Sequence, residues 1–93
     1  IDAPECLRIG LANRIVSHEQ LVDETYNLAR KMKEGPLQAM AETKNLLDRE
    51  ADMDLNEALE LEAAEQARLM QSADFKEGYR AFIEKRPPRF NRS

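Results

Sequence analysis

The fold is decided near one end of this sequence, where residues 74–90 read DFKEGYRAFIEKRPPRF. Asp74 stands at the start of an apolar pattern of helical period, and Lys85 and Arg86 stand at its end, where charges of these signs stabilise a helix dipole. The two prolines that follow cannot continue a helix. The stretch therefore predicts an amphipathic helix ending in Lys85 and Arg86, then a rigid basic tail. The residues expected to share one helix face are Phe75, Gly78, Tyr79 and Phe82.

Outward from this stretch, the sequence predicts only helices. Ser17 with Gln20, and Asp54 with Glu57, have the spacing of capping boxes at helix starts. Gly35-Pro36 ends one helix and starts another. The fold class is therefore all-α, with four main amphipathic helices and a short N-terminal turn. We expect the helices at about residues 17–34, 36–50, 54–71 and 72–86, the last capped by Ser72 or Asp74.

The start of the chain predicts little regular structure. Asp2 caps a short turn with Pro4 near its first position, and Gly10 ends it. Residues 11–16 are too short and too isolated for more than an extended connector.

Composition limits what the chain can do by itself. Of its 93 residues, 5% are aromatic, none is Trp, and 34% are charged. A small domain buries only part of its apolar surface, so we expect a thin core lined by Leu, Ala and Met that needs a partner surface.

Charge is distributed unevenly along the chain, whose net charge is −4. Residues 48–65 hold eight acidic side chains against Arg49, while residues 76–93 hold six basic ones against Glu77 and Glu84. General nucleic-acid binding needs a broad basic face, so we expect no nucleic-acid partner. A local site for one phosphorylated ligand fits this pattern better.

Metal, disulfide and membrane functions find no support in the sequence. The chain has one cysteine, Cys6, and one histidine, His18, which excludes an internal disulfide and a His/Cys zinc cluster. A carboxylate-bridged bundle needs Glu-x-x-His pairs, and His18 is not so placed. No apolar run approaches the roughly 18 residues of a membrane span, and no leader is visible. We expect a cytoplasmic protein, with mitochondrial or peroxisomal targeting left open.

Several segments together resemble the C-terminal region of the enoyl-CoA hydratase/isomerase family, the crotonases. Residues 3–16, APECLRIGLANRIV, are similar to the family's junction pattern A-x-x-A-x-x-x-G-L-V-N-x-V-V, and residues 82–85 match its C-terminal end. Taken in order along the chain, the matching positions cover essentially all of it. The intermediate matches are Leu28-Ala29, Pro36-Leu37, Lys44, Leu55 to Leu59, Glu62 and Gln66.

The resemblance implies a function and an assembly. It implies a coenzyme A thioester as substrate, no covalently bound cofactor, and a homo-oligomer that is a trimer or a hexamer. It places the family's catalytic core before Ile1, so we assign no catalytic residue and no metal ligand. We therefore expect residues 1–16 to form a junction from that core and residues 17–93 to form a helical oligomerisation domain.

Phe82 and Lys85 are the candidate ligand-binding residues. Spacing alone favours a core or interface aromatic for Phe82 and a helix C-terminal charge for Lys85. The resemblance implies that the pair meets the adenine and phosphate end of coenzyme A bound in a neighbouring subunit. An aromatic ring offers a stacking face and an ammonium a mobile positive charge, which suits that ligand.

Other polar and small residues have structural interpretations. Glu62 and Gln66 interrupt an apolar stripe, and we expect a hydrogen-bonded strut across a helix or subunit contact in preference to acid/base catalysis. Gly78 inside a helix predicts a close approach by another helix or by a ligand, with helix packing favoured, since glycine costs about 1 kcal/mol there relative to alanine. His18 is expected at an exposed helix start. Asn91 stands where the family often has glycine.

A second interpretation of the whole chain is a non-catalytic helical interaction module that binds partner helices through its apolar stripes. It explains the amphipathic patterns equally well. It does not explain the joint occurrence of the Gly10-Leu11 junction, the Pro36 to Lys44 spacing and the Phe82 to Lys85 pair.

Overall fold

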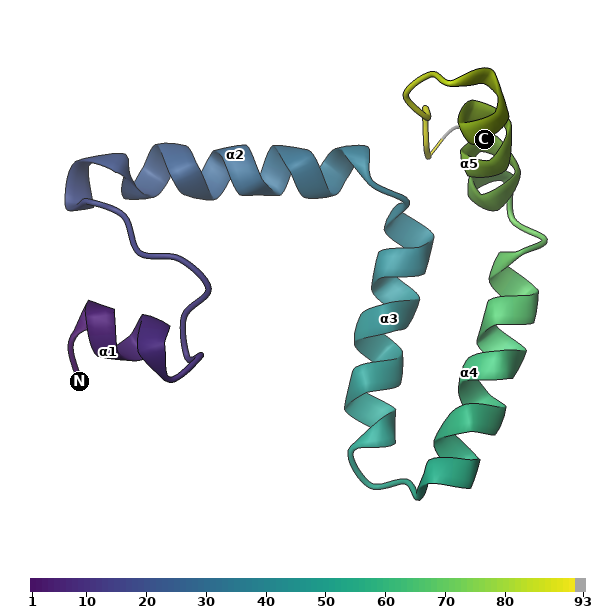
Figure 1. The fold of residues 1–93 in the computed structure, drawn as a ribbon, viewed down its shortest axis with the longest axis horizontal. Coiled ribbons are helices and arrows are strands. Elements are labelled where there is room, and N and C mark those ends of the chain that lie inside the picture. The colour runs from purple at the N-terminus through teal and green to yellow at the C-terminus, as the bar shows by residue number, and fades with distance from the viewer. Residues whose placement is uncertain (92–93) are drawn as a thin grey trace. The chain divides into compact units, whose positions relative to one another are not determined.

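A computed structural model of the chain describes residues 1–91, so Arg92 of the basic tail lies outside the described part. The all-α prediction is confirmed, since this part contains helices and no strand. Figure 1 labels the α-helices along the chain. The elements are α1 (Ala3–Arg8), the 3₁₀ helix η1 (His18–Gln20), α2 (Leu21–Glu34), α3 (Leu37–Glu50), α4 (Leu55–Leu69) and α5 (Ala73–Glu84).

The chain forms two compact units, Ile1–Arg30 and Lys31–Ser93, and the boundary between them falls inside α2. Each unit is described by itself. The functional division that we expect between residues 16 and 17 stays a prediction, because compactness of the chain does not test which segment serves assembly.

In the first unit, α1 begins as predicted. The Asp2 carboxylate caps it by accepting a hydrogen bond from the Glu5 N–H (3.0 Å), and Gly10 follows with a φ of 78°. The expected capping box at Ser17 is wrong in detail. Its hydroxyl bonds the Gln20 side chain (3.2 Å) and no backbone N–H, and a 3₁₀ turn precedes α2.

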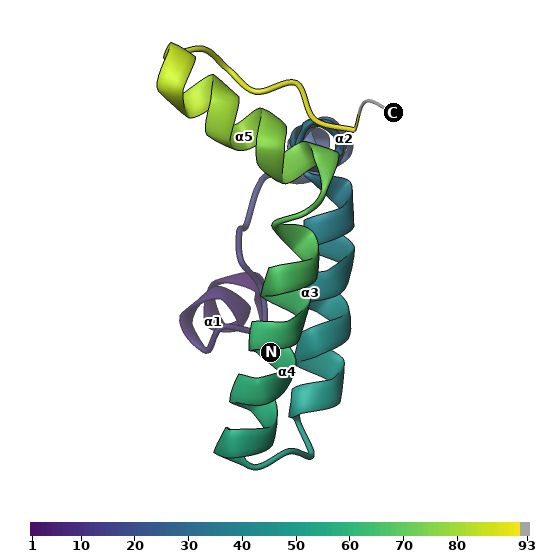
Figure 2. The same cartoon turned by 90° about the vertical axis from the view of Figure 1, so that its right-hand side faces the viewer.

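In the second unit, α3 and α4 form an antiparallel hairpin, side by side in both views (Figures 1 and 2). α3 starts directly after Gly35-Pro36, as the sequence predicts. The Asp54 carboxylate caps α4 by accepting from the Glu57 N–H (2.8 Å). Arg68 of α4 ties the helices together by pairing with Glu42 of α3 (2.7 Å).

After α5 the chain turns back and runs alongside that helix toward the start of α3 (Figure 2). Ser72 caps α5, since its hydroxyl accepts from the Phe75 N–H (3.1 Å). Asp74 instead accepts from the Asn91 N–H (2.7 Å), so it fastens the returning tail.

Burial is sparse throughout the described residues, where Ala81 alone is buried, at 2% exposed. Large apolar side chains such as Leu55 and Phe82 are 73% and 80% exposed. The thin core expected from composition is therefore confirmed. None of the helices in residues 1–91 is long and apolar enough to cross a membrane.

Candidate functional site

The two predicted ligand residues lie together at the C-terminal end of α5. Phe82 projects from the last turn of the helix and is 80% exposed, and Lys85 is the exposed residue directly after it. The Lys85 N–H donates to the Phe82 carbonyl oxygen (3.3 Å). Phe82 is therefore not buried among the described residues, so its ring is available to a ligand or to a partner surface.

The helix ends one or two residues earlier than predicted. Lys85 has the left-handed conformation, with φ 53° and ψ 46°, and the Arg86 N–H donates to the Ala81 carbonyl oxygen (3.1 Å). These bonds form a Schellman motif, which satisfies the last carbonyl groups of a helix. Lys85 and Arg86 thus lie in the turn and not in the helix, because the chain must reverse direction to run back along α5.

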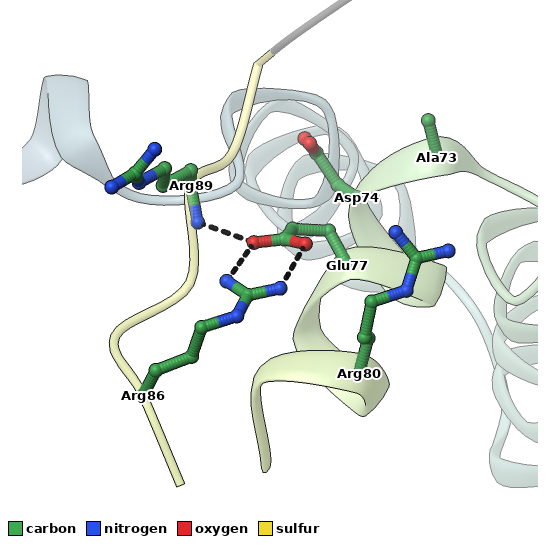
Figure 3. Close-up of a pocket in the computed structure, with 6 residues that line it drawn as sticks. All are labelled: Ala73, Asp74, Glu77, Arg80, Arg86 and Arg89. Atoms are coloured by element: carbon green, nitrogen blue, oxygen red, sulfur yellow. Dashed lines mark hydrogen bonds and ion pairs between the residues drawn. The ribbon is translucent and has the colours of Figure 1, made fainter. Parts of the chain in front are cut away.

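Glu77 is the polar centre of this reversal. Its two carboxylate oxygens accept from the two terminal nitrogens of Arg86 (2.8 and 2.9 Å), and one also accepts from the Arg89 N–H (2.7 Å). Figure 3 shows the carboxylate held between these donors. We call this arrangement of Glu77, Arg86 and the Arg89 N–H the Glu77 clamp. It borders a cleft of about 500 Å³ that Ala73, Asp74 and Arg80 also line.

Electrostatics favours the ionised form of Glu77 at neutral pH. The side chain of Arg86, followed by the Arg89 N–H, lowers the pKa of Glu77 from 4.5 to about 2. Glu77 and then Glu84, whose carboxylate lies 2.5 Å from the Arg86 Nε, raise the pKa of Arg86. A carboxylate this firmly ionised is a poor general acid or base near neutral pH. The clamp is therefore suited to holding the tail in place.

Asn91 fastens the other end of the tail. It has the left-handed conformation, with a φ of 64°, which asparagine tolerates better than most residues other than glycine. Its side-chain amide donates to the carbonyl oxygens of Gly35 (2.8 Å) and Lys33 (3.2 Å) and accepts from the Leu37 N–H (3.1 Å). Asparagine thus supplies both the conformation of a glycine and a side-chain link to the start of α3.

Gly78 is explained by the same tail. A Cβ atom at this position would lie 3.6 Å from the ring of Phe90, so the tail packs directly over the α5 backbone. Close packing is present, but its partner is the returning tail of the same unit and not another helix.

Glu62 and Gln66 are exposed, and the donor expected to face Glu62 is absent among the described residues. Glu62 faces Glu50 of α3 in a cleft between α3 and α4. Burial, followed by the neighbouring Glu62, raises the pKa of Glu50, and the Glu50 Oε1 atom is buried with no hydrogen-bond partner in this part of the chain. Two carboxylates cannot bond each other unless one is protonated. The strut across a subunit contact stays a prediction.

Two features of the site were missed by the sequence analysis. The Glu77 clamp joins residues nine and twelve positions apart, and its signal in the sequence was an acidic residue one turn after Asp74, followed by a basic tail. The Asn91 link joins residues 54 to 58 apart and had no local signal beyond an asparagine at a position often held by glycine.

His18 and Cys6 lie in the first unit. Among the described residues, no group of three or more His, Cys, Asp or Glu side chains is arranged to hold a metal ion.

Comparison with known proteins gives a consistent result. The family model for enoyl-CoA hydratase/isomerase matches residues 1–93. Crotonyl-CoA hydratase of Syntrophomonas wolfei is 35% identical over 91 residues, which are 97% of this chain and 35% of that protein. A Thermus thermophilus protein named as an enoyl-CoA hydratase is 37% identical over 90 residues, 97% of this chain and 36% of its own length.

Solved structures agree. An enoyl-CoA hydratase structure from Geobacillus kaustophilus has a TM-score of 0.90 and 35% identity, and the match covers 98% of this chain and 34% of that one. The chain spans about a third of the length of the curated relatives it matches.

Proposed function

This chain belongs to the enoyl-CoA hydratase/isomerase family, and on that premise we propose that it forms the C-terminal helical part of a crotonase-like acyl-CoA enzyme, a hydratase or an isomerase. The coenzyme A thioester is its substrate. The rest of the enzyme supplies the oxyanion hole and the acid/base groups, because such chemistry depends on donors aimed at the thioester oxygen. A purely helical interaction module is not favoured by a family match along the whole chain.

Phe82 and Lys85 bind the nucleotide end of coenzyme A in this proposal. The observation that carries it is their exposure side by side at the end of α5, on residues that match the family's pattern. Among the described residues no carboxylate forms an ion pair with the Lys85 ammonium, whereas the adjacent Arg86 is paired twice. Lys85 therefore has its charge available for a phosphate group.

The chain also serves assembly. Leu47, Leu55 and Leu59 of the α3–α4 hairpin are 67%, 73% and 55% exposed, and Tyr79 and Ile83 of α5 are 64% and 60% exposed. Apolar faces of this kind are typical of contact surfaces. We propose a trimer, which pairs into a hexamer in some family members, and a cytoplasmic enzyme of fatty acid metabolism. Sedimentation of the full-length protein tests the assembly.

Substitution of Lys85 tests the ligand site. In the full-length enzyme, Lys85→Ala is expected to raise KM for acyl-CoA about ten- to a hundredfold, the equivalent of a charge-assisted hydrogen bond, with less effect if the contact is exposed. The value of kcat should stay nearly unchanged, because the nucleotide end is bound alike in the ground and transition states.

A short pantetheine thioester that lacks the nucleotide is the matched control. Lys85→Ala should leave its kinetics unchanged. An equal loss on both substrates would assign Lys85 to the fold or to assembly and remove the ligand role.

A further inference from the structure

The backbone conformation at position 85 is energetically unfavourable for lysine. A left-handed φ of 53° is disfavoured for residues with a Cβ atom, and glycine is the usual choice after a helix end of this kind. Glycine would close the same Schellman turn at lower cost. The turn therefore does not account for a lysine there, whereas a task for its side chain does.

The residues on both sides of Lys85, Glu84 and Arg86, are held by hydrogen bonds. Arg86 is bound by both oxygens of Glu77 (2.8 and 2.9 Å) and by Glu84 (2.5 Å). The Arg89 N–H adds a bond to the same Glu77 carboxylate (2.7 Å). Lys85 thus stands between a helix end and a fixed tail, so its backbone has little freedom.

We propose that Glu77 is a positioning residue for Lys85, acting through Arg86 to hold the lysine backbone in the left-handed turn and so to limit the region in which its ammonium group can meet a phosphate of the ligand. This inference rests on the proposed function of Lys85. The two adjacent basic residues have different roles. Arg86 forms ion pairs with Glu77 and Glu84, whereas the charge of Lys85 is available to the ligand. Preorganised contacts gain affinity because less ordering remains for the binding step.

A persistent clamp is required for this role. The pKa of Glu77, held at about 2 by Arg86, keeps the carboxylate ionised at every pH at which the enzyme would work. The bidentate geometry also fixes the plane of the Arg86 guanidinium, which one ammonium could not do.

The test is a double-mutant cycle in the full-length enzyme with Glu77→Gln, Lys85→Ala and the double variant. Glu77→Gln is expected to raise KM for acyl-CoA about two- to tenfold, with kcat unchanged, as for the loss of one immobilised side chain. It should leave KM for the pantetheine thioester unchanged. In the Lys85→Ala background the same substitution should add no further rise, because the group that it positions is gone.

A purely structural role predicts different numbers. An unchanged KM for Glu77→Gln, or an equal rise with and without Lys85, would overturn the inference and leave the proposed function standing. A wild-type KM for Lys85→Ala would overturn the proposed function and this inference with it.

Two further variants serve as a substitute test and as a charge control. If Glu77→Gln does not assemble, Arg86→Lys is scored by the same criteria, since it keeps the charge and loses the bidentate contact. Glu60→Gln removes an equal charge from an exposed residue of α4 that has no hydrogen bond from its side chain among the described residues, and both constants should stay at their wild-type values.

Discussion

Glu77 on α5 and Glu50 on α3 are carboxylates in opposite situations within the same unit. Glu77 meets a guanidinium and a backbone N–H, and its pKa falls to about 2. Glu50 is partly buried opposite another carboxylate, Glu62, and its pKa rises. The carboxylate at the end of α5 thus has its polar partners within the chain. The face between α3 and α4 is incomplete, which is the state expected of a surface that a partner covers.

The largest effect on the end of α5 and its tail should come from Asn91. Asn91→Ala removes three side-chain hydrogen bonds and places a Cβ-bearing, non-polar residue at a φ of 64°, so we expect the free energy of unfolding to fall by about 2 to 3 kcal/mol. Asn91→Gly loses the same bonds without the backbone cost and should lose about 1 kcal/mol less. Thermal denaturation of both variants measures this, and equal losses would contradict it.

The second-largest effect is expected at low pH, where protonation of Glu77 should release the tail. The folded pKa of Glu77 lies below its usual value of 4.5, so the clamp contributes its full stability above pH 4.5 and loses it as the pH falls toward about 2. The Glu50 contribution has the opposite sign, since a raised pKa means stability that is present below 4.5 and lost as the pH rises. NMR titration of labelled glutamate carboxyl groups would show both, and a Glu77 signal that titrates near 4.5 would count against the clamp.

A smaller effect is expected from Glu62→Gln. If only Glu50 faces this side chain, the substitution supplies a donor to the orphaned Oε1 atom and raises the melting temperature at pH 7. If a donor from another subunit completes the pair, as the strut hypothesis requires, the melting temperature falls. The sign of the change therefore decides whether another subunit supplies a donor to Glu62. Glu60→Gln serves as the control for charge alone.

The smallest effect concerns Gly78. An alanine Cβ would lie at an ordinary contact distance, 3.6 Å, from Phe90, and alanine favours a helix by about 1 kcal/mol over glycine. We expect Gly78→Ala to leave stability unchanged or raise it by up to about 1 kcal/mol in thermal denaturation. Gly78→Leu should displace the Phe90 ring and destabilise the tail. A loss with alanine as large as that with leucine would mean that the contact is tighter than the structure gives.

Much of the fold was predictable because its signals are local. The Asp54 cap bonds a residue three positions on, and Gly35-Pro36 sets backbone conformation by itself. Local rules could not give the left-handed Lys85, since the reversal there depends on Glu77 and on the tail that runs back along α5.

The same limit applies to the candidate site. Phe82 and Lys85 were found by resemblance, and the structure adds their exposure and the clamp beside them. Glu62 was expected to meet a donor because its position in an apolar stripe was visible. Its actual neighbour, Glu50, is set by the rotation of α3 against α4, which the sequence pattern does not specify.

The Asn91 link also has a consequence for the order of events during synthesis. The Leu37 N–H at the start of α3 donates its hydrogen bond to the side chain of a residue 54 positions later. A ribosome adding about 5 to 20 residues per second needs about 3 to 10 seconds to reach that residue. During this interval the Asn91 side chain has not yet been made, so the Leu37 N–H at the start of α3 has no such partner. The Asn91 link can therefore form only after α3, α4 and α5 have all been synthesised.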